Sequence, residues 1–152
     1  MKIFIPIKHN SQRVERKNFR DFGGEPLFKR TLLRYPDDEV YVDTDSDEII
    51  DLIKKDDRLA NVVAFSRKEE LRGHKVSVCD LIQDFIKTYN VESHVVQIHV
   101  TSPFLQRETI AKAEKFMEDH DSVVACNIYQ SRFWRKEAYG YCPVNHNPVK
   151  ME

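Results

Sequence analysis

The sequence lacks the patterns of disulfide bonds, zinc sites and membrane-embedded segments. Its three cysteines, Cys79, Cys126 and Cys142, form no Cys-x-x-Cys pair and support neither a disulfide framework nor a zinc ribbon. No apolar run is long enough for a secretory signal or a membrane span. We therefore expect a cytoplasmic protein without a membrane partner.

A strong charge of one sign is missing as well. The 24 basic and 25 acidic residues give a net charge of −1, which exerts no overall attraction on nucleic acid. Nucleic acid is therefore not an expected partner, and any binding of an anion must come from local charge.

Glycine is scarce, and its positions exclude the common phosphate-binding loops. The chain has neither the Gly-x-Gly-x-x-Gly of dinucleotide-binding folds nor a Walker A loop, because its four glycines are Gly23, Gly24, Gly73 and Gly140. A Gly-x-Ser-x-Gly elbow for acyl transfer is also lacking. The six histidines give no metal site that their spacing supports.

Short apolar runs rich in β-branched residues recur along the chain. Hydrophobic residues make up 41% of the sequence and charged residues 32%, which is the composition of a globular domain. Apolar runs without polar alternation are typical of parallel strands that are covered on both faces. The predicted strands are residues 3–5, 40–42, 62–65, 95–98 and 122–125.

Helical patterns lie between these runs. Pro26 suits the first turn of a helix, and Ser46 and Ser77 can each cap a helix N-terminus. The apolar residues after Ser77 follow a 3.6-residue period up to Tyr89, and a further helix is expected over residues 110–117. Alternating strands and helices predict an α/β fold with a doubly wound, mostly parallel, Rossmann-like sheet.

We expect residues 1–152 to form a single nucleotide-binding domain. No repeat or low-complexity linker divides the chain. The tail from Ser131 lacks a clear period, so it is predicted to be a loop or an unfinished element.

The loop after the first predicted strand is the most informative segment. In a doubly wound sheet, ligands bind beyond the carboxyl ends of the strands. Residues 8–18 are long for a strand–helix connection and carry a cluster of cations: Lys8, Arg13, Arg16 and Lys17, with Arg20 just beyond. Clustered cations beside Asn and Ser side chains can wrap a polyphosphate. A solvated basic loop is the alternative interpretation, and spacing alone leaves it open.

Several motifs follow one another in a fixed order from residue 2 to about residue 128. They are Ile5-Pro6-Ile7-Lys8, Ser11, Arg13, Lys17-Asn18, and the stretches 21–27, 42–49, 65–71, 101–105 and 121–124. Together they resemble the amino-terminal part of the CMP-sugar-acid synthetases. These are the cytidylyltransferases that activate sialic acid, related nonulosonic acids and 3-deoxy-manno-octulosonate. Several motifs in fixed order are far more specific than any one of them.

The resemblance implies a nucleotide-diphospho-sugar transferase-like fold and an enzymatic function. The family transfers CMP from CTP to a 2-keto-3-deoxy sugar acid, such as a sialic-acid-like compound, and releases pyrophosphate. The partners that it implies are CTP and a sugar acid. The alternative is a catalytically impaired nucleotide-binding or oligomerisation module with the same fold.

The resemblance also gives individual residues a task. Arg13 and Lys17 would be the catalytic cations that face the CTP phosphates. The other implied substrate-binding residues are Lys8, Asn10, Ser11 and Asn18 in the loop, Arg67 with backbone groups near Val76 at the cytosine, and His99, Thr101 and Ser102 at the acceptor. Two alternatives stay open: Arg67 as a surface partner of Glu69 or Glu70, and Thr101 with Ser102 as a simple turn.

Some positions depart from the family pattern. Lys8 stands where Arg is usual, His99 with Val100 where Gln is common, and His74 where an Asp often follows. The family implies Mg²⁺ and a homodimer, but its Asp-x-Asp metal ligands and its dimerisation element lie in a later region that nothing here matches. No metal ligand is therefore assigned in this chain, and the acidic cluster at residues 43–47 is expected to begin a helix instead.

Overall fold

The computed structural model describes residues 1–73, 75–128 and 131–145. The chain divides into two compact units, Met1–Lys115 and Phe116–Glu152, which are described separately below. None of the helices in the described ranges is long and apolar enough to cross a membrane.

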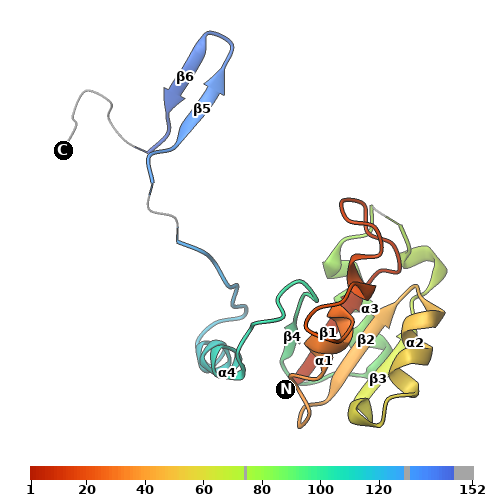
Figure 1. Ribbon diagram of the computed structural model, residues 1–152. Helices are drawn as coiled ribbons and strands as arrows, with labels where there is room; N and C mark the ends of the chain where they lie inside the picture. Colours follow the sequence, from red (N-terminus) through yellow and green to blue (C-terminus); the bar gives the residue numbers. More distant parts are fainter. Residues whose placement is uncertain (74, 129–130, 146–152) are drawn as a thin grey trace. The chain divides into compact units, whose positions relative to one another are not determined.

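A parallel four-stranded sheet forms the centre of the first unit (Figure 1). Its strands, in the order β3-β2-β1-β4, are β1 (Lys2–Ile7), β2 (Val40–Thr44), β3 (Val62–Ser66) and β4 (Val95–Gln97). The predicted α/β fold with its parallel sheet is thereby confirmed, and each of these strands lies where an apolar run predicted it.

Helices and short 3-10 turns connect the strands. The helices are α1 (Leu27–Leu32), α2 (Asp47–Lys54), α3 (Val78–Tyr89) and α4 (Arg107–Phe116), and the 3-10 turns are η1 (Lys17–Phe19), η2 (Asp57–Leu59) and η3 (Glu69–Leu71). Both predicted caps are confirmed. The Ser46 hydroxyl accepts the Ile49 amide at 3.3 Å, and Ser77 forms a reciprocal capping box with Asp80.

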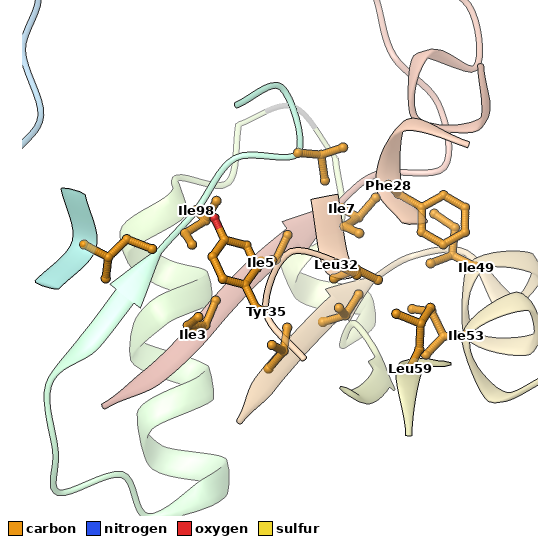
Figure 2. Close-up of a cluster of buried hydrophobic side chains, with 14 residues drawn as sticks. Ile3, Ile5, Ile7, Phe28, Leu32, Tyr35, Ile49, Ile53, Leu59 and Ile98 are labelled. Atoms are coloured by element: carbon orange, nitrogen blue, oxygen red, sulfur yellow. The ribbon is translucent and has the colours of Figure 1, made fainter. Parts of the chain in front are cut away.

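The helices cover both faces of the sheet. Because side chains alternate along a strand, Ile3, Ile5 and Ile7 of β1 point to one face, where they pack with residues of α1 and α2 such as Phe28 and Ile49 (Figure 2). Phe4 points to the other face and stacks on Phe85 of α3 with 4.8 Å between the ring centroids. This two-sided burial explains why the strands are apolar along their whole length.

The strand order reverses beside β1. The chain passes outward from β1 to β2 and β3 and then returns to the opposite side of β1 to form β4. The carboxyl ends of β1 and β4 therefore flank the topological switch point, which is where open α/β sheets bind ligands.

The second unit contains an antiparallel hairpin of β5 (Trp134–Glu137) and β6 (Gly140–Pro143), joined by a two-residue turn. The prediction of a loop or unfinished element after Ser131 was therefore wrong for this segment. Its strands are exposed and lack an apolar run, so hydrophobic patterning gave no signal for them. Gly140 follows the turn with φ +137°, a conformation that side chains rarely adopt.

The predicted strand at residues 122–125 was also wrong. Residues 121–128 are exposed, have no regular secondary structure and pair with no strand in the described part of the chain. A β-branched run becomes a strand only where a neighbouring strand satisfies its backbone groups, and the apolar pattern alone does not supply that neighbour.

Candidate functional site

A cavity of about 670 Å³ opens at the switch point of the sheet. Its lining comes from the loop after β1, from the segment between β3 and α3, from α3 itself and from the residues after β4. All of the predicted site residues except Ser102 line it: Lys8, Asn10, Ser11, Arg13, Lys17, Asn18, Arg67, Val76, His99 and Thr101. Ser102 lies in an exposed turn, where its amide donates to the His99 carbonyl oxygen at 2.9 Å.

The cations of the loop divide into two groups. Lys8, Arg13 and Lys17 line the cavity. The Lys8 ammonium donates to the Gly73 carbonyl oxygen at 2.7 Å, whereas the Arg13 and Lys17 side chains have no ion pair or hydrogen bond to the described residues. Within the described residues, the Arg13 and Lys17 side chains therefore leave two positive charges at the cavity without a partner.

The remaining loop cations serve the loop rather than the cavity. Arg16 donates to both carboxylate oxygens of Glu48 at 2.8 Å, and its guanidinium lies over the Phe19 ring, 4.3 Å from the centroid. Arg20 donates to the Glu15 carbonyl oxygen at 3.2 Å. Arg16 and Arg20 thus stabilise the loop, a role that the clustering of charge in the sequence does not distinguish from contact with a ligand.

The loop is fastened to the start of α2. The His9 amide donates to the Asp45 carboxylate at 2.6 Å, and His9 Nδ1 is 2.7 Å from the Ser46 hydroxyl. Together with the Arg16–Glu48 contact, these bonds hold both ends of residues 8–18 on one helical turn. Sequence reasoning missed His9 and Glu48, because the partners are more than thirty residues apart.

Asn18 braces the loop from inside. Its side chain is buried, and its amide group donates to the Lys8 carbonyl oxygen at 2.7 Å. This contact closes the base of the loop across ten residues. The resemblance placed Asn18 at the nucleotide, and the structure gives it this bracing contact in addition to a place in the cavity wall.

Arg67 has a buried partner, so the alternative of a surface contact with Glu69 or Glu70 was wrong. Its Nε donates to both carboxylate oxygens of Asp43, at 3.1 and 3.2 Å. Its Nη2 donates to the backbone oxygens of Asp43 and Ile7. Burial raises the pKa of the Asp43 carboxyl above its ordinary value, and the Arg67 charge and hydrogen bonds oppose that rise.

One end of the Arg67 guanidinium is left unsatisfied. Nη1 is fully buried and has no hydrogen-bond partner among the described residues, although Arg67 lines the cavity. Val76, Val78 and Leu81 supply apolar lining to the same cavity. Buried donors are almost always paired, so this unpaired donor, on a residue that lines the cavity, is a candidate contact for a ligand that carries an acceptor.

The described residues offer no ready-made metal site. No group of three His, Cys, Asp or Glu side chains gathers within them. Asp43 is committed to Arg67, and Asp45 accepts the His9 amide. The carboxylates near the cavity thus hold protein groups and do not form the open oxygen cluster that Mg²⁺ favours.

These features define an α/β domain with a parallel sheet and a cavity at the switch point of that sheet, where such folds bind ligands. The family model for cytidylyltransferases matches residues 3–138. The chain therefore belongs to the cytidylyltransferase family, and the family resemblance of its motifs is confirmed.

Three curated relatives illustrate the range of the family. The chain is 29% identical over 124 residues to the pseudaminic acid cytidylyltransferase of Campylobacter jejuni, covering 76% of this chain and 52% of the relative. It is 26% identical to the N-acylneuraminate cytidylyltransferase of Streptococcus agalactiae (77% and 29% covered). It is 30% identical to the 3-deoxy-manno-octulosonate cytidylyltransferase of Christiangramia forsetii (75% and 44% covered). The chain thus spans about half or less of the length of these relatives.

Solved structures show the same fold. One is the CMP:2-keto-3-deoxy-manno-octonic acid synthetase complexed with CTP, which matches with a TM-score of 0.60 at 20% identity and covers 77% of this chain and 46% of its own. A cytidylyltransferase from Leptospira borgpetersenii matches with a TM-score of 0.60 at 19% identity, with 78% and 49% covered.

Proposed function

We propose that this chain binds CTP as the nucleotide-binding part of an enzyme that transfers CMP to a 2-keto-3-deoxy sugar acid. The observation that carries the proposal is the cavity itself. It combines two cations whose side chains have no partner among the described residues, Arg13 and Lys17, with Arg67, whose buried Nη1 is unpaired within the same ranges. Family membership supports the same reaction class.

The loop end of the cavity suits the phosphates. In the proposed reaction, the anomeric hydroxyl oxygen of the sugar acid forms a bond to the α-phosphorus while its proton passes to solvent water. The bond from the α-phosphorus to the oxygen that bridges it to the β-phosphorus breaks, and pyrophosphate leaves with that electron pair. Arg13 and Lys17 would hold the leaving pyrophosphate, with Lys8, Asn10 and Ser11 beside them, so catalysis would rest on positioning and charge stabilisation.

The Arg67 end of the cavity suits cytosine. Cytosine has an unprotonated N3, an acceptor to which one N–H of Nη1 could donate. Uracil carries an N–H at position 3, which would leave donors facing one another. A buried donor left unpaired by the wrong base is the usual source of strong discrimination between similar ligands. The apolar lining near Val76 suits the faces of a flat ring.

The acceptor side is proposed to lie at the carboxyl end of β4. His99 and Thr101 line the cavity there, and Ser102 follows in the adjacent turn. His99 Nδ1 is 3.5 Å from the Gln97 side-chain amide. The three relatives act, by their names, on three different sugar acids, so the proposal is limited to the class.

Mg²⁺ belongs to the proposal only as a cofactor that the family implies. The carboxylates near the cavity do not fit it, as described above, and no step is assigned to the metal here. This same observation favours the second candidate function, a nucleotide-binding module with little turnover of its own. Pyrophosphate release from CTP, measured with Mg²⁺ and a panel of sugar acids, distinguishes the two. Robust release identifies the enzyme, and CTP binding without release identifies the module.

Calorimetric titration with CTP, UTP, ATP and GTP tests the binding site that both candidates share. We expect CTP to bind at least about tenfold more tightly than UTP, a difference of roughly 1.4 kcal/mol. Equal affinities for the two pyrimidine nucleotides would leave a phosphate site without base recognition. No binding of any nucleotide would refute the proposal as a whole.

A further inference from the structure

The Asp43–Arg67 pair is the most deeply buried charge pair among the described residues. The side chains of Arg67 and Asp43 are 1% and 4% exposed. Asp43 lies on the interior strand β2, in register with Pro6 of β1 and Phe65 of β3. The neighbours of Asp43 at positions 40–42 are apolar and buried, so the fold places a charge where a hydrophobic side chain would ordinarily pack.

Stability alone does not explain this pair. Removing two charges from water costs free energy, and replacing a buried ion pair by apolar residues of similar volume is often neutral or stabilising. The geometry gives the pair another task. The Asp43 carboxylate accepts hydrogen bonds from Arg67 Nε, and the Asp43 backbone oxygen accepts one from Arg67 Nη2. Of the three guanidinium nitrogens, Nη1 alone has no partner among the described residues.

We propose that Asp43 is a positioning residue that makes the nucleotide site selective for a pyrimidine base with an acceptor at position 3. The inference rests on the proposed function, because it assigns the origin of the selectivity to a residue that does not line the cavity. Asp43 acts in two ways. Its contacts fix the plane of the guanidinium so that the Nη1 donors keep one direction, and its charge balances that of Arg67.

The charge balance keeps the two ends of the cavity chemically distinct. With Arg67 neutralised by Asp43, the uncompensated positive charge at the cavity belongs to Lys8, Arg13 and Lys17 in the loop, none of which pairs with a carboxylate among the described residues. A triphosphate is therefore drawn to the loop and not to the base end. Without Asp43, Arg67 would become a free cation that can bind phosphate in place of a base.

The test compares CTP, UTP and inorganic tripolyphosphate as ligands of wild type, Asp43→Asn and Asp43→Glu, by calorimetry. For Asp43→Asn we expect CTP affinity to fall at least tenfold and the CTP-to-UTP ratio to approach one. Tripolyphosphate should bind as tightly as to wild type or more tightly. A merely structural role would weaken tripolyphosphate and CTP together, and this result would overturn the proposal.

Asp43→Glu covers the case in which the Asn variant does not fold. It keeps the charge beside Arg67 but moves the carboxylate by one methylene, so we expect a reduced CTP-to-UTP ratio with unchanged tripolyphosphate affinity. Asp47→Asn removes an equal charge from an exposed position on the same segment and should leave all three affinities unchanged. A wild-type ratio in the folded Asp43 variants overturns the inference. Failure of the wild type to prefer CTP refutes the proposed function instead.

Discussion

At the scale of single residues, the site depends on charges that the fold leaves uncommitted. Lys17 begins η1 at the edge of the cavity and has no protein partner in the described ranges. Arg16, its neighbour, adopts φ +45° and donates hydrogen bonds to Glu48. Of these two adjacent cations, Arg16 therefore stabilises the loop, whereas Lys17 faces the cavity. Backbone conformation and burial, not residue type, separate the two.

Lys17→Ala tests the phosphate contact. Removing a charge-assisted hydrogen bond should weaken CTP binding by roughly 1.5–3 kcal/mol. The measurement is the dissociation constant for CTP, with Lys54→Ala as the matched control because Lys54 is an exposed lysine in the last turn of α2. An unchanged constant for Lys17→Ala would show that the loop does not bind the phosphates.

Tyr35 is a second residue whose polar atom lacks a partner. Its hydroxyl is buried and unpaired among the described residues, inside the core that faces α1 and α2 (Figure 2). Burial also raises the pKa of this phenol. We expect Tyr35→Phe to raise the free energy of unfolding by about 1 kcal/mol, because a buried polar group without a hydrogen bond is costly.

Tyr41→Phe is the matched comparison. The Tyr41 hydroxyl accepts the Lys2 ammonium at 2.9 Å, so its removal should lower the free energy of unfolding by about 1 kcal/mol. Urea denaturation of the two variants measures both changes. Destabilisation by Tyr35→Phe would show that the hydroxyl has a partner, such as a buried water.

At the scale of elements, α1 and η2 are joined through one carboxylate. Asp56 caps η2 and receives the Lys29 ammonium at 2.7 Å and the Arg58 guanidinium at 2.7 and 2.8 Å. The Arg58 and Lys29 hydrogen bonds hold the pKa of Asp56 well below its usual range. The ionised form of this carboxyl is therefore the one that the folded state favours.

The lowered pKa of Asp56 gives stability a defined pH dependence. The stabilisation is complete well above the unfolded-state pKa of about 3.9 and is lost as the pH falls from there toward the lower folded-state pKa. We expect Asp56→Asn to be less stable than wild type at pH 7, with a difference that shrinks as the pH falls below about 4. Urea denaturation of both proteins across this range measures it. A difference that does not change with pH would contradict the assignment.

The helix caps and the long-range contacts show which structural features local sequence patterns can predict. The caps at Ser46 and Ser77 were predictable because a capping bond joins residues only three positions apart. The Asp43–Arg67 pair spans 24 residues and the His9–Ser46 contact 37, and nothing in either local sequence specifies its partner. The resemblance to a family supplied the site positions, but the bracing contacts emerged only from the fold.

At the scale of the whole molecule, an apolar run became a strand only where a neighbour was present. The runs at residues 3–5 and 40–42 pair in parallel register as parts of β1 and β2. The run at 122–125 is also short and rich in β-branched residues, but it pairs with no strand in the described part of the chain. Pairing between distant segments is a property of topology, and a single sequence expresses it only weakly.

The division into two units has a spectroscopic consequence. Trp134 is the only tryptophan of the chain, and it belongs to β5 in the second unit, whereas Met1–Lys115 contains tyrosines but no tryptophan. Tryptophan emission therefore reports on the hairpin, and far-UV circular dichroism reports mainly on the α/β unit. A two-stranded hairpin is marginally stable by itself, so we expect its emission to change at lower urea than the dichroism. Added CTP should shift the dichroism transition to higher urea and leave the emission transition in place. Coincident transitions that CTP moves together would show that the two units unfold as one.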